Sequence, residues 1–144
     1  FAITGHEHHY GTGVTVNLAP DGSGGTMTPV YNPSSFSWSD PYTQEQTPAF
    51  SIPAGGGLDF TCEWDNTSSK TIDFGESACQ EMCFFWMYYY PAPSSEVCIH
   101  TDQGSAYGIS DLCCPSDNPL CAFLTSYFDG HGNGSGTNTP TCSY

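Results

Sequence analysis

Alternating apolar and polar residues are the main structural signal in the first half of the chain. Apolar side chains occupy every second position in residues 14–18 and again in residues 58–62. A period of two is typical of a β-strand with one buried face, so each segment predicts a strand. Shorter strands are expected at residues 49–52 and 70–74, and the turn-rich residues 20–48 predict loops around short strands.

Residues 82–90 form the most apolar run of the chain, and both sets of alternate positions in it are apolar. A strand of this kind is expected between two layers, as in the middle of a sandwich. Sixteen Gly and eleven Pro residues argue against a helical bundle. The pattern therefore predicts an all-β protein built as an antiparallel, jelly-roll-like β-sandwich.

The character of the sequence changes at Pro91. Five of the eight cysteines lie beyond it, among Gly, Ser, Pro and Asp residues, and only residues 122–128 look like an ordered apolar segment. We expect residues 1–91 to form the sandwich and residues 92–144 to form a disulfide-rich extension packed on it.

Eight cysteines in so short a chain indicate an oxidising compartment, so we expect an extracellular or secreted protein, or a periplasmic one. Free thiols or a zinc site are the alternative, but Cys113 and Cys114 are adjacent and the chain has no Cys-x-x-Cys pair. Spacing alone leaves the disulfide pairing open. Glycosylation sequons begin at Asn66 and Asn133, and no apolar run is long enough to span a membrane.

The charge of the chain limits the classes of molecule that it can bind. Fifteen Asp and Glu residues stand against one basic side chain, Lys70, which gives a formal net charge of −14. Because phosphate groups are bound by clustered Lys and Arg, this charge excludes nucleic acid as a partner. It also argues against phosphorylated substrates and anionic membrane surfaces. Cations and neutral molecules remain.

The strongest local motif is His6-Glu7-His8-His9, which holds three of the five histidines. On a strand, His6 and His8 point to the same face, so both imidazoles can bind one metal ion, and His9 faces the other way. A tag remnant or a solvated N-terminal tail is the alternative interpretation. Against it, the cluster leads through Tyr10 directly into a predicted strand.

Known metal motifs built on histidine do not fit this cluster. A histidine brace needs His at position 1 and an amino-terminal copper motif needs it at position 3, where the chain has Phe1 and Ile3. The Glu of a cupin site and the His-Glu-x-x-His of a zinc protease are also missing. A third ligand could be His100, His131, an acidic residue or Met82, whose thioether would select copper, above all Cu(I). Methionine alone is more often a core residue.

Three segments together resemble the C-terminal, methionine-copper domain of the type II ascorbate-dependent copper monooxygenases. That family includes the peptidylglycine alpha-hydroxylating and dopamine beta-monooxygenases. The resemblance covers residues 1–91, and the segments that carry it occur in the family's order: Phe1–Gly11 with the His-x-His pair, Gly57–Cys62, and Gly75–Tyr89 with Glu-Met-Cys and Tyr-Tyr.

The resemblance implies a β-sandwich and assigns a role to five residues. His6 and His8 would be the imidazole ligands, and Met82 the thioether ligand, of one dioxygen-binding copper ion per chain. Cys62 and Cys83 would form a disulfide. In the family this copper leads hydrogen abstraction from a C–H bond, and a second copper on a three-His domain delivers electrons from ascorbate.

The chain also departs from the family pattern. It begins almost at the first copper ligands, so the electron-donating copper domain and the opening strands of this domain would have to be supplied upstream or by a separate chain. In the family, the cysteine equivalent to Cys98 forms a disulfide with a cysteine in the part that precedes the first copper ligands. Basic residues that anchor the substrate have no counterpart, because Lys70 is the only cation. A peptide substrate with a free carboxylate is therefore not expected to be held by this chain alone.

Two functions remain open. The first is the copper-binding, oxygen-activating half of a monooxygenase that hydroxylates C–H bonds. The second is a non-catalytic, disulfide-stabilised structural or extracellular assembly subunit, which would self-associate through exposed edge strands. A calcium loop at residues 129–140 is set aside because Pro140 stands where the ligating Glu should be, and no Gly-x-Ser-x-Gly elbow occurs.

Overall fold

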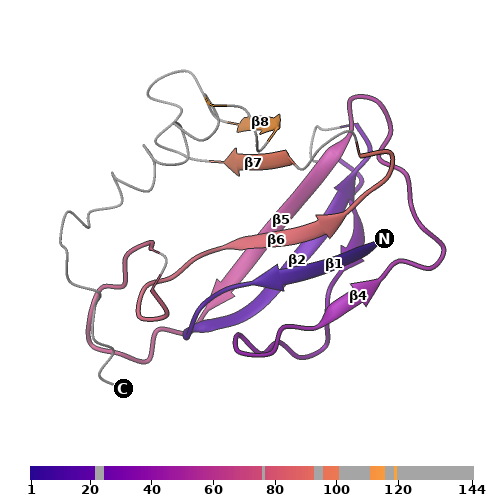
Figure 1. The fold of residues 1–144 in the computed structure, drawn as a ribbon. Helices are drawn as coiled ribbons and strands as arrows, with labels where there is room; N and C mark the ends of the chain where they lie inside the picture. Colours follow the sequence, from indigo (N-terminus) through magenta and orange to yellow (C-terminus); the bar gives the residue numbers. More distant parts are fainter. Residues whose placement is uncertain (22–24, 76, 93–95, 101–110, 116–118, 120–144) are drawn as a thin grey trace. The chain divides into compact units, whose positions relative to one another are not determined.

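The computed structural model describes residues 1–21, 25–75, 77–92, 96–100, 111–115 and 119, and this part of the chain is all-β. None of its residues forms a helix long and apolar enough to cross a membrane. Eight strands are described (Figure 1): β1 Ala2–His6, β2 Gly11–Ala19, β3 Thr28–Tyr31, β4 Thr43–Glu45, β5 Gly57–Trp64, β6 Phe84–Tyr88, β7 Glu96–His100 and β8 Asp111–Pro115.

Six of these strands form two antiparallel, three-stranded sheets. The first has the order β4-β1-β6, and the second has the order β3-β2-β5. Figure 1 shows β1 between β6 and β4. The predicted strands at residues 14–18 and 58–62 are confirmed as parts of β2 and β5, which pair along most of their length. The predicted all-β antiparallel class is confirmed.

The hydrophobic core lies between the two sheets. Ile3 from β1, Val14 and Val16 from β2, and Val30 and Tyr31 from β3 are all at most 8% exposed. Partly buried apolar residues of β5 and β6 pack against this cluster. The period-two pattern places these side chains on the inner faces, and their burial stabilises the sheet pair by roughly 1.5–3 kcal/mol for each large apolar side chain.

A disulfide between Cys62 in β5 and Cys83 just before β6 joins the two sheets, as the family resemblance implied. Its S–S distance is 2.08 Å, and its two cysteines are 21 positions apart. Closing a loop of this length is worth about 3 kcal/mol in the chain-entropy account of cross-links. The bond therefore fixes the start of β6 against the opposite sheet.

Two of the predicted short strands are wrong. Residues 49–52 form no strand, because Pro48 and Pro53 flank them without N–H donors, and Phe50 packs against the core instead. Residues 70–74 contribute only a single parallel bridge between Phe74 and Glu81.

The position expected for the apolar run at residues 82–90 is also wrong. Within the described residues, β6 is an edge strand of its sheet, and only one of its two faces packs on the core. Phe85 and Met87 pack on the core, whereas Trp86 and Tyr88 on the opposite face are 62% and 72% exposed. Burial in the core therefore does not explain why the second face of this run is apolar.

The strands fall into two compact units. Phe1–Tyr90 belong to one unit, and the antiparallel pair β7–β8 belongs to the other. The predicted division of the chain at residues 91 and 92, and the packing of the extension on the sandwich, stay predictions.

Candidate metal centre

The rings of His6 and His8 lie next to each other. His6 is the last residue of β1, and His8 follows two positions later, with ring centroids 5.2 Å apart and planes at 86°. Ile3, Gly5 and Glu7 are buried on the opposite side of this segment. The two imidazoles therefore lie together although His8 follows the end of β1 and is itself only 8% exposed.

A backbone carbonyl orients the ring of His8. Its Nδ1 lies 3.0 Å from the carbonyl oxygen of Gln80. Because a carbonyl oxygen only accepts, Nδ1 must carry the proton and donate, which leaves the Nε2 lone pair of the neutral ring for a metal ion. This is the arrangement that commonly fixes the tautomer of a metal-binding histidine.

Glu81 ties the histidine segment to the residue that precedes Met82. One carboxylate oxygen, Oε2, accepts the backbone N–H of His8 at 3.1 Å and the indole N–H of Trp64 at 2.9 Å. The other, Oε1, accepts the backbone N–H of Tyr10 at 2.7 Å. Three donors therefore converge on one side chain, and Met82 is its immediate neighbour in the chain.

Glu7, which stands between His6 and His8 in the sequence, carries a buried carboxyl group. It is 0% exposed; Oε2 accepts the backbone N–H of Gly13 at 3.1 Å, and Oε1 has no hydrogen-bond partner. Burial raises the pKa of Glu7 to about 7, against the opposing effect of the Gly13 hydrogen bond and with a further rise from Glu81. Gly11 makes room for this side chain, because a Cβ at that position would clash with it.

The environment of His6 favours its neutral form. Burial lowers the pKa of His6, and the neighbouring His8 lowers it further, while Glu81 acts in the opposite direction. A neutral imidazole keeps the lone pair that a metal ion needs. The ring also packs against Phe84 in β6, at a centroid distance of 4.5 Å.

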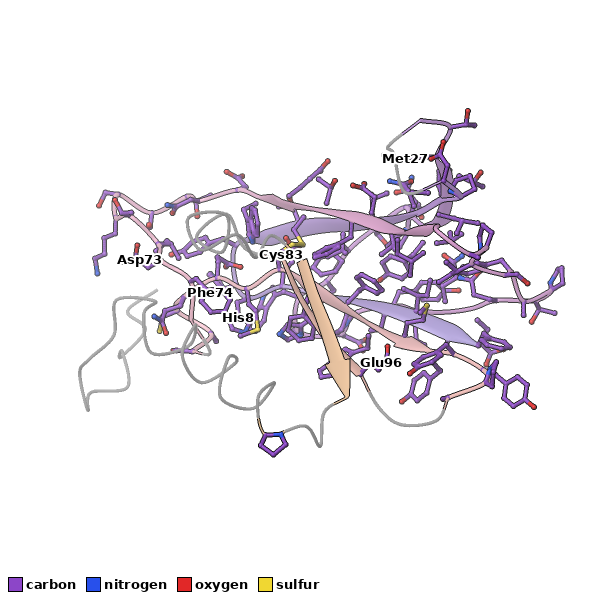
Figure 2. The ribbon with its side chains drawn as sticks, turned by 90° about the horizontal axis from the view of Figure 1, so that it is seen from above. His8, Met27, Asp73, Phe74, Cys83 and Glu96 are labelled. Atoms are coloured by element: carbon purple, nitrogen blue, oxygen red, sulfur yellow. A yellow bond between two sulfur atoms is a disulfide. The ribbon has the colours of Figure 1, made fainter. Side chains whose placement is uncertain are left out.

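Met82 is partly buried at the wall of a cavity of about 350 Å³. Tyr10, Trp64, Phe74 and Glu81 also line this cavity, and its wall is mainly apolar. Figure 2 shows His8 and Phe74 in the same region of the molecule. The hydrogen bonds of His8 to Gln80 and Glu81 bring the segment that carries Met82 beside the histidine pair.

Of the other candidate histidines, only His9 belongs to the same described unit as His6 and His8. His9 packs against Tyr10 and Trp38 instead, at centroid distances of 5.0 and 5.5 Å. His100 belongs to β7 in the other unit, and His131 lies outside the described residues. In the described part of the chain, no three His, Cys, Asp or Glu side chains converge on one point. Met82 faces a cavity whose lining residues do not include His6 or His8.

Sequence reasoning did not identify Gln80 and Glu81 as supports of the histidine pair. Their contacts to His8 join residues more than 70 positions apart, which no local pattern reveals. Only the position of Glu81 directly before Met82, within the Glu-Met-Cys signature, could have drawn attention to it.

The chain matches the family model described as copper type II ascorbate-dependent monooxygenase, C-terminal domain, over residues 1–108. It therefore belongs to this family, as the sequence resemblance suggested. The matched range continues beyond residue 91, where that resemblance ended. A comparison with curated proteins gave no match, and neither did a comparison with solved structures.

Proposed function

We propose that this chain is the dioxygen-binding copper domain of an ascorbate-dependent monooxygenase, with one copper ion held by His6, His8 and Met82. The observation that carries the proposal is the orientation of His8. Its Nδ1 is occupied by the Gln80 carbonyl, so Nε2 is available beside the segment that supplies Met82.

The chemistry of these donors favours copper over other ions. Two imidazoles and a thioether form a soft donor set that suits Cu(I), whereas calcium and magnesium require oxygen ligands. Structural zinc sites usually have four Cys, His or carboxylate ligands, and no such cluster exists among the described residues. The net charge of −14 also favours the approach of a cation.

Each neighbouring residue then has a defined task at this site. Gln80 sets the tautomer of His8, and Glu81 holds the backbone on both sides of His9 in place. Burial lowers the pKa of His6, which favours the neutral imidazole that binds a metal. Bound copper would supply the dioxygen binding and one-electron chemistry of the reaction, in which dioxygen, two electrons and two protons convert C–H into C–OH and water.

The electrons would come from ascorbate through a second copper domain, located upstream or on a separate chain. The disulfide Cys62–Cys83 supports an extracellular or periplasmic location, because such bonds persist in oxidising compartments.

Metal analysis of the purified protein tests the proposal. After loading and desalting, we expect one copper per chain, and a Cu(I) affinity that falls at least tenfold in Met82→Ile. His6→Ala should lose copper altogether. Met27→Ile is the matched control, because Met27 lies beyond the far end of β2 from the histidines, and Figure 2 shows it far from His8. Preferred binding of zinc, or an unchanged Cu(I) affinity in Met82→Ile, would contradict the proposal.

The alternative function, a non-catalytic assembly subunit, is favoured by one observation. β6 and β4 are edge strands of their sheet within the described residues, and exposed edges can pair with another chain. The mass of the protein in solution, measured by light scattering across a concentration series, distinguishes the two. A monomer that binds one copper supports the monooxygenase domain, and a metal-free oligomer supports the assembly subunit.

A further inference from the structure

The outer face of β6 presents a row of aromatic side chains that copper binding does not use. Phe84, Trp86 and Tyr88 alternate along this strand with Phe85 and Met87, which pack on the core. Trp86 is 62% exposed and Tyr88 is 72% exposed. Alternate residues of a strand are about 6.8 Å apart, so the row offers regularly spaced rings to solvent.

This aromatic row begins at the histidine pair. Phe84 lies directly opposite His6 in the pairing of β1 with β6, and its ring centroid is 4.5 Å from that of His6. The next ring, Trp86, is 5.0 Å from Phe84 and stands at 83° to it. A molecule that lies across Trp86 and Tyr88 therefore extends toward His6.

The strand beside the row carries small side chains. Ala2 lies opposite Tyr88, and Thr4 lies opposite Trp86. On the other side of β1, Thr4 pairs with Thr43 of β4. The hydroxyl groups of these two threonines are exposed and hydrogen-bonded to each other at 2.7 Å. The face thus combines aromatic rings with an open strip that bears neutral hydrogen-bonding groups.

The charge of the chain decides which occupant suits this face. With one basic residue and fifteen acidic ones, the chain disfavours acidic polymers as occupants of this face. Glu45 lies on β4, the strand on the other side of β1. Its carboxylate only accepts hydrogen bonds, so its partner must be a neutral or cationic donor. A neutral ligand with apolar ring faces and hydroxyl edges matches both the rings and the threonine hydroxyls.

We propose that this face binds a neutral glycan, and that neutral polysaccharides are the substrate class of the copper site. The C–H groups on the face of a pyranose ring carry partial positive charge and stack on the negative face of an aromatic ring. The sugar hydroxyls then reach Thr4 and Thr43. The substrate assignment rests on the proposed monooxygenase function, but glycan binding itself does not.

Binding of defined oligosaccharides tests the inference. The probes are soluble hexaoses of β-1,4-linked glucose, N-acetylglucosamine, xylose and mannose, each titrated while tryptophan fluorescence and heat are recorded. We expect saturable binding of at least one hexaose. Trp86→Ala and Tyr88→Ala should each weaken it at least tenfold. Tyr42→Ala is the control, because Tyr42 is 57% exposed but lies outside the β6 row.

Three outcomes would overturn the inference. They are the absence of saturable binding for all four hexaoses, equal binding by the Trp86→Ala and Tyr88→Ala variants, and a dimer that Trp86→Ala dissociates. Copper content is measured on the same samples, and Trp86→Ala should leave it unchanged. Loss of copper binding with retained glycan binding would refute the proposed function alone, and the reverse result would refute this inference alone.

Discussion

His8 and Glu81 are joined by a hydrogen bond of 3.1 Å between the backbone N–H of the first and the carboxylate of the second, across 73 positions of sequence. The same carboxylate accepts from Tyr10 and Trp64. This side chain therefore links the backbone of His8 to the residue that directly precedes Met82.

Replacing Glu81 by Gln should loosen this connection. An amide has one accepting oxygen, and its NH₂ group would face donors that now meet a carboxylate. We expect the free energy of unfolding to fall by about 1–3 kcal/mol, since hydrogen bonds to a charged group are worth this much. Cu(I) affinity should fall as well. Denaturation and a competitive Cu(I) titration measure both, with Glu45→Gln on exposed β4 as control; equal values for Glu81→Gln and wild type would refute the role.

The dependence of stability on pH should reveal the buried carboxyl group of Glu7. Its pKa is about 7 in the folded protein and 4.5 in the reference state, so the folded state binds more protons between these values. The contribution of Glu7 to stability is thus present below pH 4.5 and is lost as pH rises toward 7. At about 1.4 kcal/mol per pKa unit, the loss is about 3 kcal/mol.

Urea denaturation of metal-free protein from pH 4 to 8 measures this effect, with Glu7→Gln as the comparison. His6, whose pKa is lowered, changes stability in the opposite direction, but it is present in both proteins. The stability of Glu7→Gln relative to wild type should therefore increase from pH 4.5 to pH 7. A constant difference across this range would show that Glu7 is ionised when buried.

Removing the disulfide should affect both stability and the metal site. Cys62→Ala combined with Cys83→Ala opens the link between β5 and the start of β6. The free energy of unfolding should fall by about 3 kcal/mol. Cu(I) affinity should fall too, because Met82 is the neighbour of Cys83. Thermal unfolding with and without one equivalent of Cu(I) measures both effects, and unchanged Cu(I) stabilisation would mean that the disulfide does not position Met82.

Local patterns predicted the parts of the fold that depend on local geometry. The period of two located β2 and β5, and the i, i+2 spacing placed the rings of His6 and His8 side by side. The pairing of Cys62 with Cys83 came from the family resemblance, since spacing alone left it open.

The features that the sequence did not predict depend on contacts between distant segments. The hydrogen bonds of Gln80 and Glu81 form only when the end of β1 meets the segment before β6. The apolar run that ends in Tyr88 predicted burial on both faces, but apolarity alone cannot distinguish a covered face from one exposed for binding. The exposed rings of β6 are such a case.

X-ray absorption at the copper edge tests the central claim, that His6, His8 and Met82 hold one copper ion, most directly. Wild-type protein loaded with one Cu(I) should show imidazole nitrogens and one sulfur in its first shell. The sulfur should disappear in Met82→Ile and remain in Met27→Ile. A spectrum without sulfur in the wild type, or one that is unchanged in Met82→Ile, would contradict the account.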